Sequence, residues 1–212
     1  MPAPRIKICG VTQAATLHAC IAARADYVGF NFCPPSPRFL SLPAARDLGA
    51  QANGRITRVG LFVDADPATI AEAVEAAGLD AIQLHGSEAP QTVAALKARH
   101  GLPVWKVISV SGAADLAPAA RYAQAADLVL LDAKTPKGAL AGGLGLKFDW
   151  TLLAAWRPSG PWGLAGGLNP ANVAEAVRVT GAPLVDTASG VETAPGVKDM
   201  DLIAAFCQAA RS

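Results

Sequence analysis

The residue with the clearest chemical potential ends the first apolar segment of the chain. Cys9 closes the run Ile6–Cys9 and precedes Gly10, and Lys7 lies two residues before it. Residues two apart point to the same side of a strand, so the Lys7 ammonium is expected near the thiol, where it favours the thiolate. Cys9 is therefore a candidate catalytic group. The alternative is a buried structural cysteine, which is the role expected of the other three cysteines.

Two further side chains suit proton transfer and carboxylate binding. Asp132 ends the apolar run Leu128–Leu131, so its carboxyl is expected to be partly desolvated and to hold a proton near neutrality. Arg38 lies in a loop between Pro37 and Phe39, and its planar fork of donors suits a carboxylate. The alternatives are an aspartate that caps the following loop and a solvated or salt-bridged loop arginine.

Two pairs of small residues follow the last two apolar segments. Gly166 and Gly167 come after the seventh segment, and Ser189 and Gly190 come after the eighth. Backbone N–H groups without side-chain obstruction, beside a helix start, form a cradle for anions. Both pairs together predict phosphate binding, although either pair alone is an ordinary tight turn.

These residues must be positioned by a regular alternation of short apolar segments and alanine-rich helical patterns. The expected strands are Ile6–Cys9, Tyr27–Phe32, Val59–Val63, Ala81–His85, Val104–Val110, Leu128–Asp132, Gly163–Ala165 and Leu184–Asp186. The expected helices are Gln13–Arg24, Pro43–Ala52, Pro67–Ala77, Ala89–Arg99, Ala114–Ala125, Trp150–Trp156, Pro170–Val179 and Asp199–Ala210. Helix starts are expected at Thr12, Ser41 or Leu42, Asp66, Ser87 or Glu88, and Asn169, and helix ends at Gly78 and Gly101.

Apolar strands that alternate with helices indicate a parallel sheet covered by helices. Eight such units favour a closed (β/α)8 TIM barrel, a single catalytic domain over residues 1–212, although such barrels usually have roughly 250 residues. The alternative is a flavodoxin-like or Rossmann sheet with extra strands. The longest stretches without regular structure are Cys33–Leu40 and Ala133–Phe148, and both follow strands. Loops after the strands form the catalytic face of a barrel.

Composition and charge exclude several classes of protein. The hydrophobic fraction is 52% and the charged fraction 17%, which excludes global disorder. The formal net charge of +1 provides no general attraction for nucleic acid or an anionic membrane, so neither is expected as a partner. No apolar stretch approaches the roughly 20 residues of a membrane span, and no apolar signal segment precedes the first strand. Cys9, Cys20, Cys33 and Cys207 form no CxxC pair, so a cytoplasmic location is expected.

An ordered set of motifs resembles the phosphoribosylanthranilate isomerase family. The motifs span nearly the whole chain, and although any one of them is common, the ordered set is specific. They are Lys7-Ile8-Cys9-Gly10, Ser36-Pro37-Arg38, Gly60-Leu61-Phe62-Val63, Gln83-Leu84-His85-Gly86, Leu130-Leu131-Asp132, Phe148-Asp149-Trp150, Leu164-Ala165-Gly166-Gly167-Leu168 and Ser189-Gly190-Val191-Glu192.

The resemblance implies an Amadori rearrangement of N-(5-phosphoribosyl)anthranilate, a step of tryptophan biosynthesis that needs no metal or cofactor. It implies that Asp132 protonates the ribose ring oxygen, that Cys9 removes the C2 proton, and that Arg38 pairs with the anthranilate carboxylate. The acid and base then lie on opposite sides of the barrel mouth, with the substrate between them. Asp186 ends the eighth strand beside the phosphate turn, where it is expected to accept a hydrogen bond from a ribose hydroxyl. A structural contact across the barrel mouth is the alternative. The protein is expected to be a monomer or a homodimer.

The sequence departs from the family pattern at two places. The segment Gly142–Lys147 carries leucines between its glycines where the family usually has threonine and lysine, and Ala188 stands where serine is frequent. The rival functions are two other phosphate-binding barrels, indole-glycerol-phosphate synthase and aminoimidazole ribotide isomerase, and a catalytically silent phosphometabolite-binding protein. The second enzyme requires an aspartate at the position of Cys9. A silent binder would keep the glycines and lose Cys9 and Asp132.

Overall fold

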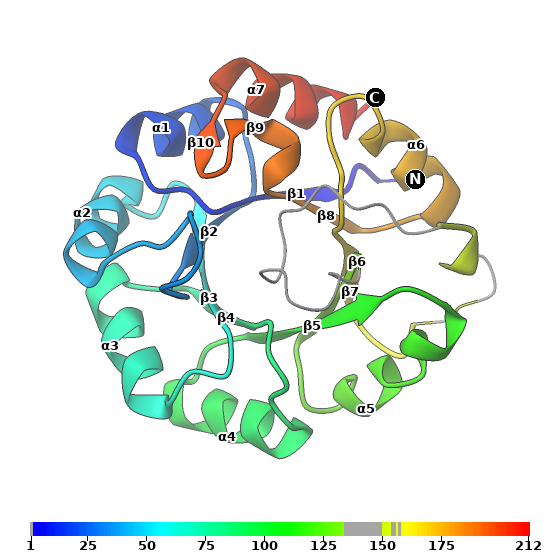
Figure 1. The fold of residues 1–212 in the computed structure, drawn as a ribbon, viewed down its shortest axis with the longest axis horizontal. Helices are drawn as coiled ribbons and strands as arrows, with labels where there is room; N and C mark the ends of the chain where they lie inside the picture. The colour runs from blue at the N-terminus through cyan, green and yellow to red at the C-terminus, as the bar shows by residue number, and fades with distance from the viewer. Residues whose placement is uncertain (1, 134–149, 154–155, 157) are drawn as a thin grey trace.

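A computed structural model, which describes residues 2–133, 150–153, 156 and 158–212, forms a closed barrel of eight parallel strands in chain order (Figure 1). The strands are β1 Arg5–Cys9, β2 Tyr27–Asn31, β3 Thr57–Phe62, β4 Ala81–Leu84, β5 Val104–Val110, β6 Leu128–Ala133, β7 Trp162–Leu164 and β8 Leu184–Thr187. Pairing of β8 with β1 closes the barrel. The predicted (β/α)8 barrel and its eight strand positions are therefore confirmed.

Helices cover the outside of the barrel. They are α1 Ala14–Ala22, α2 Leu42–Ala52, α3 Pro67–Ala77, α4 Pro90–His100, α5 Ala119–Tyr122, α6 Val173–Thr180 and α7 Met200–Ala209. The largest hydrophobic cluster packs between these helices and the sheet, and it includes Phe30, Phe62 and Phe206, which are fully buried. A second cluster fills the barrel interior with Tyr27, Trp105 and other apolar side chains from the strands. None of the helices in the described ranges is long and apolar enough to cross a membrane.

Several predicted helix boundaries are correct because local capping chemistry sets them. Ser41 and Asp66 accept hydrogen bonds from the first free backbone N–H groups of α2 and α3. Gly78 and Gly101 end α3 and α4 in the left-handed conformation, with φ of 56° and 63°. Glycine adopts this conformation without steric penalty, so these two residues stop the helices where predicted.

Other predicted boundaries are wrong. The helix expected over Ala114–Ala125 is split into the 3-10 turn η1, Ala113–Leu116, and the short α5, because Pro118 lacks an N–H donor and obstructs the preceding turn. The N-caps of α1, α4 and α6 are Gln13, Ala89 and Asn172, where Thr12, Ser87 or Glu88, and Asn169 were expected. Asn169 instead accepts a hydrogen bond from the Ala171 N–H.

Two predictions concern residues that the structure describes only in part. Of the helix expected over Trp150–Trp156, the described part is the 3-10 turn η2, Trp150–Leu153. Most of the loop Ala133–Phe148, with its glycine-rich segment Gly142–Lys147, lies outside the described residues.

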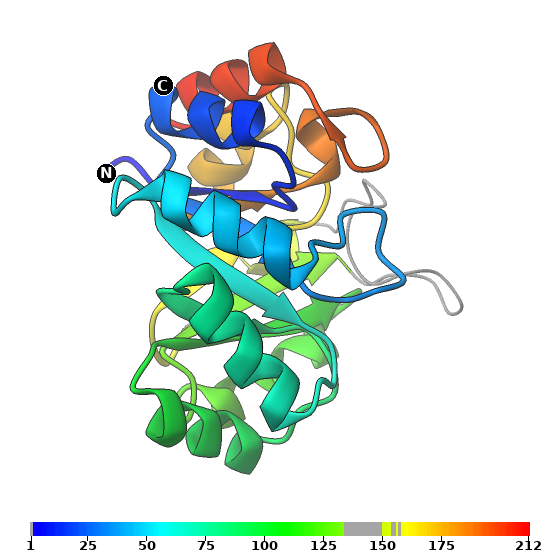
Figure 2. The same cartoon turned by 90° about the vertical axis from the view of Figure 1, so that its left-hand side faces the viewer.

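A small antiparallel hairpin after β8 was not predicted. It consists of β9, Glu192–Ala194, and β10, Val197–Lys198, and follows the 3-10 turn η3, Ser189–Val191. Figure 2 shows this hairpin and the loop after β2 at the same end of the barrel, away from the two termini. The hairpin strands are too short for a sequence pattern to reveal them, but they bring two charged side chains to the barrel mouth.

Candidate active site

A cavity opens at the carboxyl end of the barrel strands and contains about 570 Å³ of space continuous with solvent. Its lining side chains come from strand ends and from the loops after β2, β7 and β8. They are Cys9, Asn31, Arg38, Leu61, Gln83, His85, Leu130, Asp132, Ala165, Gly166, Gly167, Leu168, Asp186, Thr187, Ala188 and Ser189.

Cys9 lies at one wall of this cavity above a buried ion pair. Lys7, which is fully buried, donates a hydrogen bond of 3.0 Å from Nζ to Oδ2 of Asp186. The two residues are direct register partners on β1 and β8. Lys7 also faces Cys9: a Cβ placed on Gly29 of β2 would lie 2.9 Å from Cys9 Sγ and 3.2 Å from Lys7 Nζ. Glycine at this position thus leaves room for both groups.

The sequence predicted that the Lys7 ammonium favours the Cys9 thiolate. In the structure this effect is present but does not bring the pKa of Cys9 below its ordinary value. Burial raises the pKa of the Cys9 thiol, and Lys7 only partly opposes this effect. Burial likewise raises the pKa of the Asp186 carboxyl despite its contact with Lys7. The ammonium serves two groups, so Cys9 receives only part of its stabilisation. Asp186 therefore makes the structural contact that was the alternative expectation, through its ion pair with Lys7. Because Asp186 also lines the cavity, its hydrogen bond to a ribose hydroxyl stays a prediction.

Asp132 lies at the end of β6 with His85 beside it. The distance from His85 Nε2 to Asp132 Oδ2 is 3.4 Å, and both side chains line the cavity. Asp132 is buried, with 8% of its surface exposed, in agreement with the expected partial desolvation. His85 belongs to the motif Gln83-Leu84-His85-Gly86, but no role was predicted for it. Its signal was its position directly after β4, two residues beyond Gln83, which lines the same cavity.

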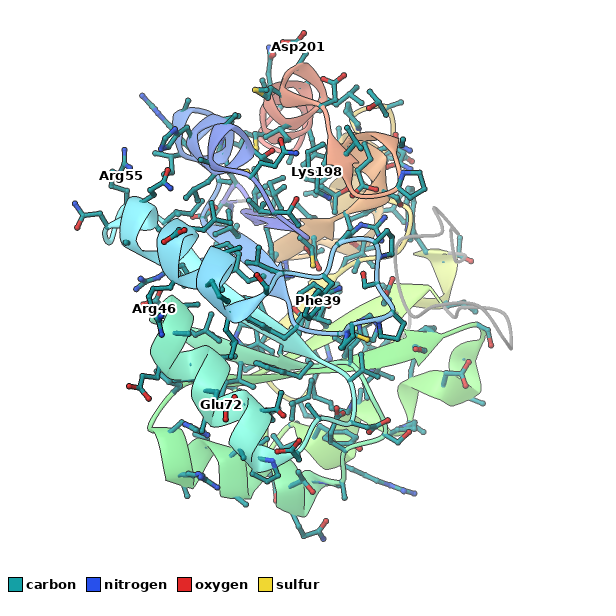
Figure 3. All side chains as sticks on the ribbon, turned by 60° about the vertical axis from the view of Figure 1, so that its left-hand side comes forward. Phe39, Arg46, Arg55, Glu72, Lys198 and Asp201 are labelled. Atoms are coloured by element: carbon teal, nitrogen blue, oxygen red, sulfur yellow. The ribbon has the colours of Figure 1, made fainter. Side chains whose placement is uncertain are left out.

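Arg38 is held in place by a buried carboxylate that the sequence analysis did not assign. Its Nε and Nη2 atoms donate to Glu192 at 2.8 Å and 2.7 Å, and Lys198 Nζ donates to Glu192 at 2.7 Å. The side chains of all three are at least nine-tenths buried. The Arg38 stem packs over Gly10 and leaves no room for a side chain there, and the positive φ of 77° at Gly10 also favours glycine. Figure 3 labels Lys198 on the hairpin and Phe39 on the loop after β2, at the same end of the barrel.

The bidentate pair with Glu192 alters how Arg38 meets a ligand. The guanidinium has five N–H groups, of which two point at Glu192. Three N–H groups remain, and one on Nη1 with one on Nη2 still forms a two-donor edge; Arg38 lines the cavity. Arg38 is therefore a salt-bridged loop arginine, as the alternative expected. This pairing does not remove the predicted role, because the ion pair orients the free edge of the group.

The loops after β7 and β8 lie against one another. The Thr187 hydroxyl donates to the Leu168 carbonyl at 2.7 Å, and a side chain on Gly190 would collide with the same carbonyl. Gly166 and Gly167 both have positive φ, 88° and 68°, and line the cavity together with Ser189. Gly190 is not among the lining residues and instead permits the close approach of the two loops. The predicted phosphate residues therefore lie in adjacent loops, three of them at the cavity.

A further buried ion pair supports the β4 side of the mouth. Lys106 donates to Glu88 at 3.0 Å and to the Gly86 carbonyl at 2.7 Å, and Glu88 accepts from the Asp64 and Gly86 N–H groups. This network anchors the turn that directly follows His85. Among the described residues, no group of three or more His, Cys, Asp or Glu side chains is arranged to hold a metal ion. The described cavity presents a carboxyl, a thiol, a guanidinium and two glycine-containing loops.

Comparison with known proteins places this chain in a defined family. The family model described as N-(5'phosphoribosyl)anthranilate (PRA) isomerase matches residues 6–209. The N-(5'-phosphoribosyl)anthranilate isomerase of Paramagnetospirillum magneticum is 53% identical over 97% of this chain and 96% of its own length. That of Bradyrhizobium sp. is 52% identical over 98% of this chain and 95% of its own length.

Solved structures agree with the sequence relatives. The crystal structure of phosphoribosyl anthranilate isomerase from Thermotoga maritima matches with a TM-score of 0.88 and 36% identity, over 98% of each chain. A second structure, of the isomerase in complex with reduced 1-(o-carboxyphenylamino)-1-deoxyribulose 5-phosphate, matches with a TM-score of 0.86 and 35% identity, again over 98% of each chain.

Proposed function

The chain belongs to the N-(5'-phosphoribosyl)anthranilate isomerase family, and from this premise we propose that Cys9 and Asp132 carry its chemistry. Membership makes the protein an isomerase of tryptophan biosynthesis. Its reaction is the Amadori rearrangement of N-(5-phosphoribosyl)anthranilate to 1-(2-carboxyphenylamino)-1-deoxyribulose 5-phosphate. The observation that carries the proposal is that the thiol, the carboxyl and the glycine-lined loops share one cavity.

Asp132 acts first, as the general acid. It donates a proton to the ribose ring oxygen, the C1–O bond breaks, and an open-chain iminium forms. Its place in the cavity wall, on a strand that does not carry Cys9, lets the carboxyl reach the ring oxygen of a sugar bound in the cavity. His85, at 3.4 Å, orients the Asp132 carboxyl toward the ring oxygen and stabilises the carboxylate that remains.

Cys9 acts second, as the general base. Its thiolate removes the C2 proton, and the electron pair released from the C–H bond neutralises the iminium nitrogen to give the enolamine. The enolamine then tautomerises to the ketone. Cys9 is on β1 and Asp132 on β6, so the two groups approach the sugar from different sides of the mouth. This separation lets each group exchange its own proton with the substrate.

Substrate positioning is assigned to the remaining cavity groups. The free edge of Arg38 binds the anthranilate carboxylate, and Asp186 accepts a hydrogen bond from a ribose hydroxyl. The loops that carry Gly166, Gly167, Ser189 and Gly190 bind the phosphate through backbone N–H groups that face the cavity, and loops after β7 and β8 of a barrel are the usual place for it. Together these contacts fix the two ends of the substrate while its C1–C2 region reacts.

The test removes each proton-transfer group separately. Cys9→Ser replaces the thiol with an alcohol too weakly acidic to serve as a base, and Asp132→Asn cannot donate an acidic proton. Each should lower kcat by roughly 10²–10⁴. The affinity for the product, measured by fluorescence titration, should stay nearly unchanged. Because burial raises the pKa of Cys9, kcat/KM should climb as pH rises on the acid side of its profile.

The controls are Cys20→Ser, Cys33→Ser and Cys207→Ser, none of which lines the cavity. They should remain active. A Cys9→Ser protein that turns over like the wild type, beside another cysteine variant that is dead, would refute the assignment. If both Cys9→Ser and Asp132→Asn retained full activity, the proposed acid–base pair would be abandoned altogether.

We further propose that one chain is a complete catalytic domain, active as a monomer or a homodimer, because every assigned residue comes from the same barrel. Sedimentation measured at assay concentrations would test this, and activity confined to a larger assembly would contradict it. A cytoplasmic location is also proposed. All four cysteines are free thiols, as is usual in a reducing compartment.

A further inference from the structure

Lys7 is a fully buried cation to which the proposed reaction assigns no role. A buried charge is unfavourable unless it is paired, and its partner is Asp186, 3.0 Å away on the strand that closes the barrel. An apolar residue would fill the barrel centre without this cost. The charge therefore calls for an explanation beyond packing.

The ion pair is in contact with the catalytic thiol. Cys9 Sγ and Lys7 Nζ both lie within 3.2 Å of the point where a Gly29 side chain would begin, so the sulfur and the ammonium occupy the same small space. The second oxygen of Asp186, Oδ1, is buried and has no hydrogen-bond partner among the described residues. The cluster thus contains a proton donor, a cation and a carboxylate with spare acceptor capacity.

Charge balance favours one particular way of forming the thiolate. Releasing the thiol proton to solvent would leave the buried cluster with a net charge of −1, because Lys7 and Asp186 already neutralise each other. If Asp186 takes the proton instead, the cluster contains a thiolate, an ammonium and a neutral carboxylic acid. Its net charge remains zero, so the desolvation penalty of an unbalanced charge is avoided.

We propose that Lys7 is a positioning residue that lets Cys9 and Asp186 share one proton, so that Asp186 receives the thiol proton and the thiolate forms inside a neutral cluster. The transfer has two steps. Lys7 Nζ gives a proton to an Asp186 oxygen, which breaks an N–H bond and forms an O–H bond. The resulting amine takes the proton of Cys9 Sγ, which restores the ammonium and leaves the thiolate.

This inference rests on the proposed role of Cys9 as the base, and it explains how that base operates at neutral pH. Burial holds the pKa of Cys9 above its ordinary value, so direct loss of the proton to solvent would leave little thiolate. Other charged groups also face the cluster, and all of them remain in the experiments below. They are Lys198 on β10, Arg38 with its partner Glu192, and Asp132 with His85 beside it.

The experiment measures the rate of Cys9 alkylation by iodoacetamide against pH in the free enzyme, with each cysteine quantified by peptide mass spectrometry. Iodoacetamide reacts with the thiolate. A shared proton gives the wild type a two-step profile, with a plateau at neutral pH where the thiolate–carboxylic acid form is present, and a second rise in alkali. A single-step wild-type profile would overturn the proposal, because coupled groups titrate in two macroscopic steps.

Two variants should remove the plateau and move the profile in opposite directions. Asp186→Asn keeps the shape of the side chain but cannot take the proton, and it leaves the Lys7 charge unopposed, so alkylation near neutral pH should rise about tenfold. Lys7→Met removes the cation, so alkylation at neutral pH should fall about tenfold or more. Equal shifts in the same direction, or no shift, would refute the shared proton. Asp186→Asn alone decides the matter if Lys7→Met does not fold.

The matched control is Lys106→Met, which removes another buried, ion-paired lysine, but one that lies on the outer side of the barrel beside Tyr122 of α5 and pairs with Glu88. It should leave the Cys9 profile unchanged, whereas a similar shift would show a general loss of barrel integrity. Alkylation needs no turnover, so this result is independent of the catalytic test. Activity loss in Cys9→Ser without a two-step profile would refute the shared proton alone, and full activity of Cys9→Ser would refute the base itself.

Discussion

Glu192→Gln isolates the buried charge that holds Arg38. The substitution keeps the shape of the side chain but leaves two buried cations, Arg38 and Lys198, with a neutral group between them. Their side chains are 9% and 1% exposed, and breaking a buried ion pair by removing one partner costs roughly 3–5 kcal/mol. For a chain of this size, that loss lowers Tm by about 6–20 °C.

The assay is urea unfolding followed by circular dichroism over a range of pH. Burial alone would raise the pKa of Glu192, but hydrogen bonds from Arg38 and the charge of Lys198 outweigh it and hold the pKa below its ordinary value. A carboxylate with a depressed pKa stabilises the fold above the pKa of the unfolded chain, and this stabilisation is lost as pH falls through the folded value. The stability difference between wild type and variant should therefore shrink in acid.

The control for this prediction is Glu175→Gln, which breaks an exposed pair with Arg178 on the surface of α6. It should cause no measurable change in unfolding, because exposed pairs are screened by solvent. The reasoning would fail if Glu192→Gln unfolded at the same urea concentration as the wild type. It would also fail if the stability difference were the same at acid and neutral pH.

Three further substitutions test the substrate contacts and the close packing around the thiol. Gly167→Asp places a carboxylate at the cavity and should raise KM strongly; an unchanged KM in the folded protein would remove the phosphate assignment. Arg38→Lys keeps the charge but loses the fork, and should weaken substrate binding by about 1–3 kcal/mol, whereas a substrate analogue without the carboxylate should bind both proteins equally. Gly29→Ala brings a methyl group against Cys9 and Lys7, and should lower thermal stability by about 1–3 kcal/mol together with kcat; a fully active, equally stable variant would show that the thiol has room to move.

Much of the candidate site was predictable because local pattern and position carry it. Cys9, Asp132 and Asp186 each terminate a short apolar run, and the carboxyl ends of parallel strands meet at one face of a barrel. Gly166 and Gly167 follow the next-to-last strand in the same way. The presence and order of the strands depend on hydrophobic runs that a single sequence displays directly. The prediction that these residues lie at one end of the barrel was therefore correct.

The missing parts depend on contacts between distant segments. Glu192 lies 154 residues from Arg38, and no periodicity connects a hairpin with strands of three and two residues to a loop after β2. The pairing of His85 with Asp132 likewise depends on side-chain orientation across the mouth. The break at Pro118 is different, because the proline is visible in the sequence and proline interrupts a helix, so this boundary was predictable.

The pairing of β1 with β8 has a consequence for synthesis of the chain. Lys7 meets Asp186 across 179 residues of sequence, so its partner is among the last parts of the barrel to leave the ribosome. Until then the nascent chain contains a lysine destined for the interior but without its counter-charge, and an open sheet with two free edges. Early strands can collapse against their helices, but the proton-handling cluster cannot exist before closure. The active site is therefore a product of the final folding event, and any truncation that ends before β8 removes it entirely.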